Sequence, residues 1–177
     1  MTDQSTTSKE GKLCLTRRRF LMASGTAGTA SVLMSIPGMS KPVWAKTVNY
    51  PKKTIGKLSK MKTDKEVIVD YPDEDSPVVL VKLGTPAGGG VGPGGDIVAF
   101  SAVCTHMGAD LDASYKAKHK GLGPCPLHMT SFDLTRHGIV TGGHATESLP
   151  QIALEIKGDY IIATGVSGLI YGRSANL

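Results

Sequence analysis

Short hydrophobic runs rich in β-branched residues are spaced along the chain from residue 66 onward. Glycine, proline or polar residues separate each run from the next, which is typical of strands connected by turns. The pattern predicts strands at residues 66–70, 78–83, 97–102, 131–134, 138–141, 152–157, 160–164 and 169–171. The chain is therefore expected to be a mostly β protein.

The segments between these runs contain residues that predict turns and loops. Lys-Gly-Asp at residues 157–159 predicts a hairpin turn, residues 84–96 form a long Gly/Pro loop, and residues 112–120 suggest a short helical turn. The 177 residues include 22 glycines and only 5% aromatic residues, which suits a β domain with many loops. No segment repeats at the period of a solenoid or propeller. The 132 residues from Lys46 onward should bury roughly two-thirds of their unfolded surface, enough for one core.

The net charge of +5 is concentrated near the start of the chain. Residues 1–45 carry +4 of it, and the remaining 132 residues carry +1. Only residues 46–65 form a basic stretch, with seven lysines against Asp64. A nucleic-acid-binding domain needs a basic face on its folded body. We therefore expect no nucleic-acid partner and interpret residues 46–65 as a solvated arm, with a docking arm for a partner subunit as the alternative.

Residues 1–45 resemble an export signal. Arginines at 17–19 precede Phe-Leu, similar to a twin-arginine signal, and an apolar stretch rich in small residues follows at 20–36. Small or apolar residues at Val43 and Ala45 suit cleavage before Lys46. We predict that residues 1–45 are removed and that residues 46–177 form one periplasmic domain.

The alternative for this segment is an uncleaved membrane anchor. The apolar stretch is about 17 residues long, at the lower limit of a bilayer span, and serine, threonine and glycine dilute it. A membrane association is therefore expected only if the signal stays uncleaved. The resemblance to a twin-arginine signal also implies export in the folded state, a route typical of proteins that receive a cofactor before export.

Two cysteines remain after the predicted cleavage, because Cys14 lies in the signal. Each of the two has a histidine close by: Cys104 precedes His106, and Cys125 precedes His128. Three interpretations compete. A tetrahedral zinc site accepts two Cys and two His ligands, but its usual spacings place like ligands together. A disulfide would leave both histidines unexplained, and a [2Fe–2S] cluster with two Cys on one iron and two His on the other would use all four.

At this point the sequence resembles a known family. Cys-Thr-His-Met-Gly at 104–108 and Cys-Pro-Leu-His at 125–128 are similar to the two binding loops of Rieske proteins. Residues 90–108, 142–156 and 165–177 further resemble the small subunit of arsenite oxidase, so the similarity covers most of the chain after Tyr71. The small subunit of a related molybdopterin iodate reductase would share these motifs.

The resemblance implies a fold and a cofactor. The fold is an antiparallel β-sandwich with an inserted cluster-binding subdomain at about residues 103–144. One [2Fe–2S] cluster per chain would be held by Cys104 and Cys125 on one iron and by His106 and His128 on the other. Histidine in place of thiolate raises the potential of such clusters, to roughly −150 to +300 mV across the class.

The resemblance also implies a function, namely an electron-transfer subunit of an oxidoreductase with no substrate chemistry on this chain. In the arsenite oxidase family the small subunit is periplasmic and docks on a large molybdopterin and iron–sulfur subunit. In that family electrons then pass from the small subunit to a soluble cytochrome c or copper protein. In an iodate reductase they would flow in the opposite direction. The alternatives are a membrane-anchored Rieske subunit of a quinol-oxidising cytochrome complex and a zinc-stabilised structural module.

The sequence departs from the quinol-oxidising Rieske proteins at the two loops. Those relatives carry an additional cysteine in each loop and join the two by a disulfide, whereas the corresponding positions here are Ala109 and Leu127. The loops must be held by packing and by the cluster itself. We therefore expect a metal-dependent subdomain that is loose without its cluster.

The resemblance assigns cluster-tuning positions as well. High-potential members have a serine and a tyrosine where this chain has Thr130 and Phe132, and both hydroxyls donate hydrogen bonds to sulfur. Phe132 cannot donate, so we expect a potential in the middle of the class range. Residues 142–150 correspond to a lid loop over the cluster, in which His144 is interpreted as a surface residue, with a position close to the cluster as the alternative. His119 and His137 fit no ligand spacing, and Met107 and Met129 are expected to shield the cluster.

Overall fold

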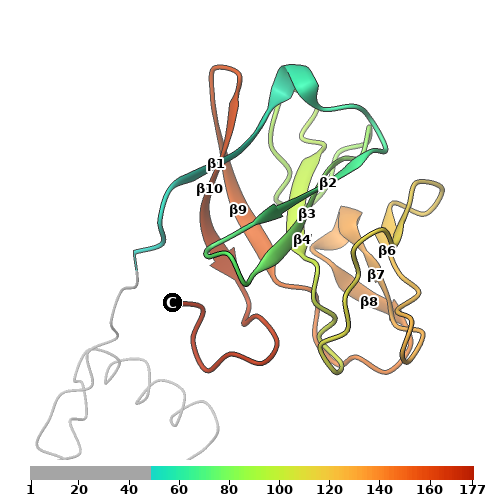
Figure 1. The fold of residues 1–177 in the computed structure, drawn as a ribbon. Helices are drawn as coiled ribbons and strands as arrows, with labels where there is room; N and C mark the ends of the chain where they lie inside the picture. Colours follow the sequence, from blue (N-terminus) through green and yellow to red (C-terminus); the bar gives the residue numbers. More distant parts are fainter. Residues whose placement is uncertain (1–48) are drawn as a thin grey trace, which may run out of the picture. The chain divides into compact units, whose positions relative to one another are not determined.

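The structure, a computed structural model, describes residues 49–177 (Figure 1). The predicted signal at residues 1–45 lies outside the described residues. The described part contains ten β-strands and two short 3-10 helices, and the strands pair antiparallel. Within residues 49–177, no helix is long and apolar enough to cross a membrane.

A six-stranded sheet forms the larger part of the fold. Its order is β1-β10-β9-β4-β3-β2, with β1 at Lys53–Lys57, β10 at Tyr160–Ser167, β9 at Gln151–Lys157, β4 at Ile97–Ser101, β3 at Pro77–Lys82 and β2 at Glu66–Asp70. Two three-stranded halves meet at a single residue pair, Phe100 with Gln151. The sheet can bend sharply at so short a junction, and residues of both halves pack together around one core.

The central strands separate two cores. Along β3, Val79 and Val81 belong to one hydrophobic cluster, core 1, while Val78 and Leu80 belong to another, core 2. Alternate residues of a strand point to opposite faces, so this division follows directly from the run of buried apolar residues. Core 2 lies between the halves of the six-stranded sheet, and core 1 lies between β3–β4 and the second sheet.

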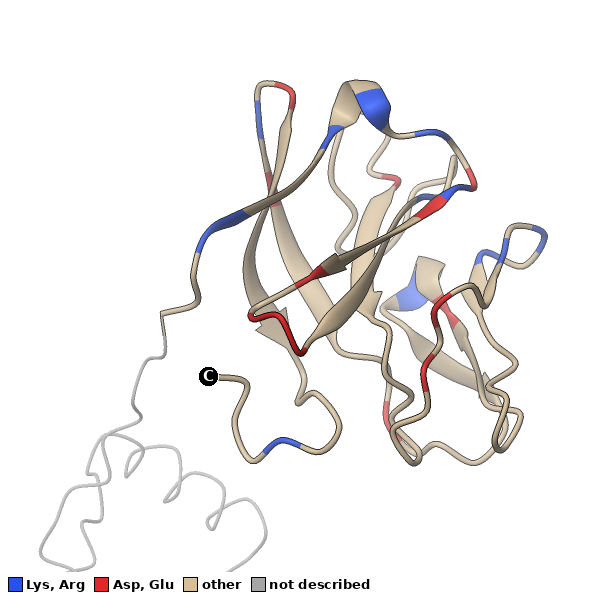
Figure 2. Cartoon of the chain, in the orientation of Figure 1, with Lys and Arg blue, Asp and Glu red and all other residues tan. Residues whose placement is uncertain are grey.

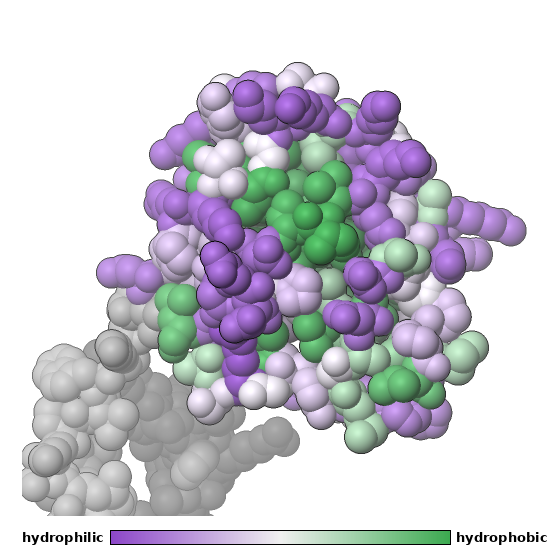
Figure 3. Space-filling model, in the orientation of Figure 1, coloured by the Kyte–Doolittle hydropathy of each residue, from purple (hydrophilic) through white to green (hydrophobic). Residues whose placement is uncertain are grey.

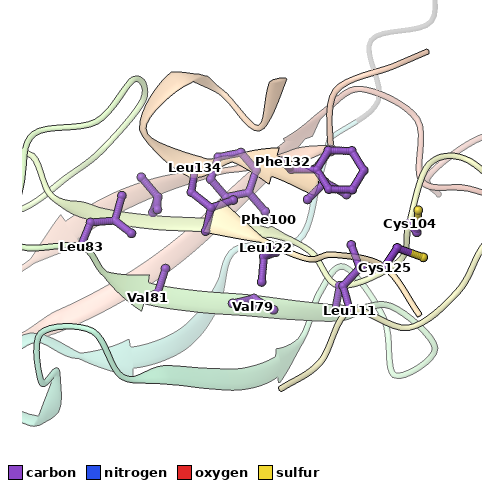
Figure 4. Close-up of a cluster of buried hydrophobic side chains, with 13 residues drawn as sticks. Val79, Val81, Leu83, Phe100, Cys104, Leu111, Leu122, Cys125, Phe132 and Leu134 are labelled. Carbon is purple, nitrogen blue, oxygen red and sulfur yellow. The ribbon is translucent and has the colours of Figure 1, made fainter. Parts of the chain in front are cut away.

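The second sheet has four short strands in the order β5-β6-β7-β8. They span Tyr115–Lys116, Gly121–Leu122, Ser131–Asp133 and Ile139–Gly142, and η2 (Leu134–Arg136) follows β7. The strands fall within the range 103–144 assigned by resemblance to a cluster-binding subdomain. Leu122, Phe132 and Leu134 contribute to core 1 together with both cysteines of the ligand motifs (Figure 4).

The predicted mostly β, antiparallel fold is confirmed, and most predicted strands lie within one or two residues of the observed ones. Two expectations are wrong. Residues 169–171 are not a strand, because Ile170 N–H donates to the side chain of Asn176 at 2.9 Å instead of to a neighbouring strand. Residues 112–120 form turns and strand β5 in place of a helical turn. The hairpin at 157–159 connects β9 and β10 as expected.

The described part of the basic stretch, residues 49–65, is part of the folded domain, which corrects the interpretation as a solvated arm. It forms edge strand β1 and the 3-10 helix η1 (Leu58–Lys60), and Ser59 is tied to Asp159 by two hydrogen bonds of 2.8 and 2.7 Å. The lysines between residues 49 and 65 are nonetheless exposed. Figure 2 shows basic residues on β1 and around η1, whereas acidic residues gather at the turn between β2 and β3.

The other edge of the large sheet is formed by β2, which is hydrophobic. Val67 and Ile68 are adjacent in sequence and both exposed. Figure 3 shows a hydrophobic area surrounded by hydrophilic residues in the middle of the face that carries β2 and β3. Unpaired strand edges of this kind present backbone hydrogen-bonding groups to other chains.

After β10 the chain forms an irregular C-terminal strap, residues 168–177. Asn176 is buried and anchors it, since its amide group donates to the carbonyl of Gly168 at 2.8 Å and to the hydroxyl of Tyr50 at 3.1 Å. Arg173 adds a bidentate contact with the carboxylate of Asp73, at 2.7 and 2.8 Å. This contact lowers the pKa of Asp73 to about 2.

Candidate cluster-binding site

The first ligand motif forms a tight loop at residues 104–109. The N–H of Cys104 donates to the carbonyl of Ala109 at 2.8 Å, and the N–H of Gly108 donates to the carbonyl of Cys104 at 2.9 Å. Gly108 has φ of +72°, a conformation in which a side chain is strained. Glycine at this position therefore lets the loop close around Cys104.

The second motif repeats this pattern at residues 125–130. The N–H of Cys125 donates to the carbonyl of Thr130 at 2.7 Å, and the N–H of Met129 donates to the carbonyl of Cys125 at 2.9 Å. Met129 takes the place of Gly108 and also has a positive φ, of 59°. The two loops thus share one backbone arrangement, although the histidine is two residues after the cysteine in the first loop and three in the second.

Both loops place their cysteines at one end of core 1 (Figure 4). Cys104 and Cys125 are buried, free thiols whose sulfurs lie next to each other. Burial raises the pKa of the Cys104 thiol and Cys125 adds to this, against the backbone N–H groups of His106 and Met107, which lower it. A bound metal deprotonates such thiols outright, so the site is suited to hold two thiolates.

The two motif histidines lie side by side, with ring centroids 4.6 Å apart and ring planes at 89°. The Nδ1 atoms of His106 and His128 are both buried and have no hydrogen-bond partner in the described part of the chain. Burying a polar atom without a partner is unfavourable. Burial lowers the pKa of His106, with smaller contributions from His128 and His144, which favours the neutral imidazole, the form that binds metal.

These features fit a two-iron cluster better than a single ion. Among residues 49–177, no three His, Cys, Asp or Glu side chains converge closely enough to hold one metal ion, whereas a structural zinc site needs four ligands. A [2Fe–2S] cluster takes a pair of ligands at each end. The two orphaned Nδ1 atoms and the two adjacent thiols are such pairs, which supports the predicted assignment of Cys104, Cys125, His106 and His128.

His144 completes a group of three histidines. Its ring lies 5.7 Å from that of His106 and 6.2 Å from that of His128, and its Nδ1 is 3.2 Å from the backbone oxygen of His128. The side chain is exposed, as expected for a surface loop. Its position beside both predicted ligands agrees with the alternative of a histidine close to the cluster.

The tuning positions lie at the base of the second loop. Thr130 is fully buried, and its hydroxyl accepts a hydrogen bond from the N–H of His144 at 3.2 Å, which leaves its own proton free to donate. A Cβ on Gly143 would lie 2.3 Å from the Cα of Thr130, so glycine lets the lid loop approach closely. Phe132 is buried in core 1 with both cysteines.

The remaining candidates lie around or away from this site. Met107, Met129 and Leu127 are exposed on the ligand loops, and Ala109 packs against core 1. His119 is exposed in the turn between β5 and β6. His137 is exposed and hydrogen-bonded through Nδ1 to the side chain of Gln151 at 2.8 Å, in line with the expectation of a local partner.

Comparisons with known proteins agree with this geometry. The Rieske [2Fe-2S] domain family matches residues 52–153. The iodate reductase subunit IdrB of Denitromonas iodatirespirans is 56% identical over 166 residues, which cover 93% of this chain and 88% of the relative. IdrB of Pseudomonas sp. (strain SCT) is 53% identical over 161 residues, covering 91% and 84% of the two chains.

The comparison with solved structures agrees in fold. The soluble domain of the Rieske protein II (soxF) from Sulfolobus acidocaldarius superposes with a TM-score of 0.62 at 24% identity, over 71% of this chain and 83% of that one. The zinc and disulfide interpretations of the four motif residues are thereby set aside. The chain belongs to the Rieske [2Fe-2S] family and is an electron-transfer subunit that carries a [2Fe–2S] cluster.

Proposed function

We propose that this chain is the electron-transfer subunit of a periplasmic, molybdopterin-dependent iodate reductase. The observation that carries the proposal is the 56% identity to an iodate reductase subunit across 93% of this chain. The arsenite oxidase assembly, which the sequence motifs resemble equally, becomes the alternative outcome of the test below. In either assembly no substrate is transformed on this chain.

The residues of the site suit one-electron transfer. When bound, the cluster supplies a single-electron redox couple. Cys104 and Cys125 would hold it from the buried side, where core 1 excludes water. His106 and His128 would hold it from the partly exposed side, so they form the shortest path between the site and a docked protein. The paired backbone hydrogen bonds of each loop fix the ligands, which limits the rearrangement that accompanies each electron.

The proposed partners follow from the direction of electron flow in an iodate reductase. A soluble cytochrome c or copper protein in the periplasm would reduce this chain, which would pass electrons singly to a large molybdopterin and iron–sulfur subunit that reduces iodate. The twin-arginine-like residues 17–19 support export through the twin-arginine route. The mature protein should then begin at Lys46 and be recovered in the periplasmic fraction, which N-terminal sequencing of the native protein would check.

One experiment separates the candidate assemblies. The chain is purified from its native cells with whatever subunit accompanies it, and the EPR signal of its reduced Rieske cluster is followed. Iodate should oxidise the reduced complex and abolish the signal, while arsenite should leave the oxidised complex unchanged. Reduction by arsenite would instead identify an arsenite oxidase, and reduction by a quinol in a membrane complex would identify the cytochrome alternative.

The potential of the cluster should respond to Phe132. A Phe132→Tyr substitution places a hydroxyl in core 1, where the cysteine sulfurs lie, and a donor to sulfur favours the reduced state. A hydrogen bond to a charged group is worth about 1.5–3 kcal/mol, which corresponds to a rise of roughly 60–130 mV for one electron. A redox titration monitored by EPR measures this shift.

Phe100→Tyr is the matched control for that titration. Phe100 is buried in the same core but belongs to β4 and lies against Gly138. Its variant should lose stability, because a hydroxyl is buried there, without raising the potential. An unchanged potential in Phe132→Tyr would show that this position does not tune the cluster.

A further inference from the structure

The first ligand loop is contacted from outside by the C-terminal strap. A Cβ built on Gly108 would lie 2.6 Å from both Cδ1 and Cε1 of Tyr171, so the tyrosine ring lies directly against the loop backbone. Gly108 is two residues from the predicted ligand His106. The contact therefore bears on the part of the loop that sets the position of this histidine.

The strap is held firmly on both sides of Tyr171. Asn176 accepts from the N–H of Ile170 and donates to Gly168 and Tyr50, while Arg173 makes its bidentate contact with Asp73. Tyr50 and Asp73 lie more than 30 residues before the ligand loop, at the entrance to β1 and in the turn after β2. The ring of Tyr171 is thus supported by the large sheet and not by the loop itself.

The ring of Tyr171 also borders a cavity between strap and loop. This cavity of about 250 Å³ is lined by Thr105 of the loop, by Glu147 and by residues 169–173 of the strap. Cys104 and Cys125 are free thiols, so in the described residues the first loop is held by its hydrogen bonds and by packing contacts of this kind.

We propose that Tyr171 is a positioning residue that braces the first ligand loop through Gly108 and so fixes His106 at the cluster. The inference rests on the proposed electron-transfer role of the site, and it assigns to the C-terminal strap a part in holding the first ligand loop. The ring carries the contact, and its hydroxyl is not required.

The test uses the full-length chain purified with its cluster. Tyr171→Ala should speed release of the cluster to an iron chelator by about two- to tenfold, the range expected for an aromatic contact. It should also broaden the EPR signal of the reduced cluster, because His106 becomes less uniformly oriented. Tyr171→Phe keeps the ring and should therefore show the wild-type rate of cluster release and the wild-type EPR signal. Tyr160→Ala is the matched control, since Tyr160 is exposed to a similar extent, 47% against 44%, at the far end of β10.

A double-mutant cycle isolates the contact itself. Gly108→Ala introduces a methyl group that collides with the ring and also a strained backbone, whereas in a Tyr171→Ala background only the backbone strain remains. Gly108→Ala should therefore speed cluster release at least about twofold more in the wild-type background than in the Tyr171→Ala background. Additive effects of the two substitutions would overturn the proposal.

Two further outcomes would also overturn it. Tyr171→Phe could behave as Tyr171→Ala, or Tyr171→Ala could lower the stability of the cluster-free protein while the EPR line shape stays the same, which is the result of a purely structural role. A wild-type protein without any Rieske EPR signal would contradict the function of the site, whereas a normal wild-type signal with an unaffected Tyr171→Ala variant would contradict only the brace.

Discussion

Replacing Cys125 with serine should abolish the cluster and destabilise the whole second sheet. Cys125 is buried in core 1 beside Cys104, and its loop is the connection between β6 and β7. Without the metal bonds, the loops retain only their short backbone hydrogen bonds and the contacts of core 1. The free energy of unfolding should fall by more than about 4 kcal/mol, the range associated with loss of a metal site.

The measurements are iron content, the EPR spectrum of the reduced protein and thermal unfolding. His119→Ala is a control in which an exposed histidine outside the site is removed, and it should retain full iron content and the wild-type spectrum. His106→Ala and His128→Ala should lose the Rieske signal as well, because each removes one of the two orphaned Nδ1 atoms. A Cys125→Ser protein with a normal spectrum would refute the ligand assignment.

The second large effect is a gain in stability. Ala109→Cys combined with Leu127→Cys places cysteines at the two positions where the resemblance implies a disulfide in quinol-oxidising relatives. The bridge would close a loop of about 18 residues, for which roughly 3 kcal/mol of stabilisation is expected. Thermal unfolding of the oxidised and reduced forms, together with a count of free thiols, would show the bridge and its effect.

The single variant Leu127→Cys provides the baseline for this comparison, since Leu127 is exposed and its replacement leaves no cavity. Failure of the double variant to form a bridge would mean that the two loops do not face each other at these positions. The bridge should also rescue cluster retention in Tyr171→Ala, because both devices restrain the same loop. If the bridge leaves the rate of cluster release in Tyr171→Ala unchanged, the bridge and Tyr171 do not restrain the same loop.

Local sequence predicts the parts of this fold that depend on local patterns. The strands around core 2 have long alternating or fully apolar runs. The two Cys–His pairs are visible in the sequence, where spacing left three interpretations open and the resemblance to Rieske proteins favoured a cluster. Strands β5 and β6 have only two residues each, too few to show a period. In β1 a single buried residue, Ile55, stands among lysines, so the segment was interpreted as a solvated arm.

The rest of the site depends on contacts between distant segments. His144 reaches the ligand histidines from the loop after β8, and Tyr171 reaches Gly108 across more than 60 positions of sequence. The apolar residues at 169–171 have the composition of a strand, but Asn176 takes the hydrogen bond that a neighbouring strand would have made. Such long-range pairings leave no periodic signal in the residues that make them.

The unpaired β2 edge has a practical consequence for producing the subunit. Val67 and Ile68 sit on a strand whose outer backbone groups are open to pairing, so a chain made without other subunits is exposed to edge-to-edge association as its concentration rises. An Ile68→Lys substitution would place a charge on that edge without changing the ligand loops. Recombinant preparations of the isolated subunit would then remain dispersed while their cluster chemistry stays intact.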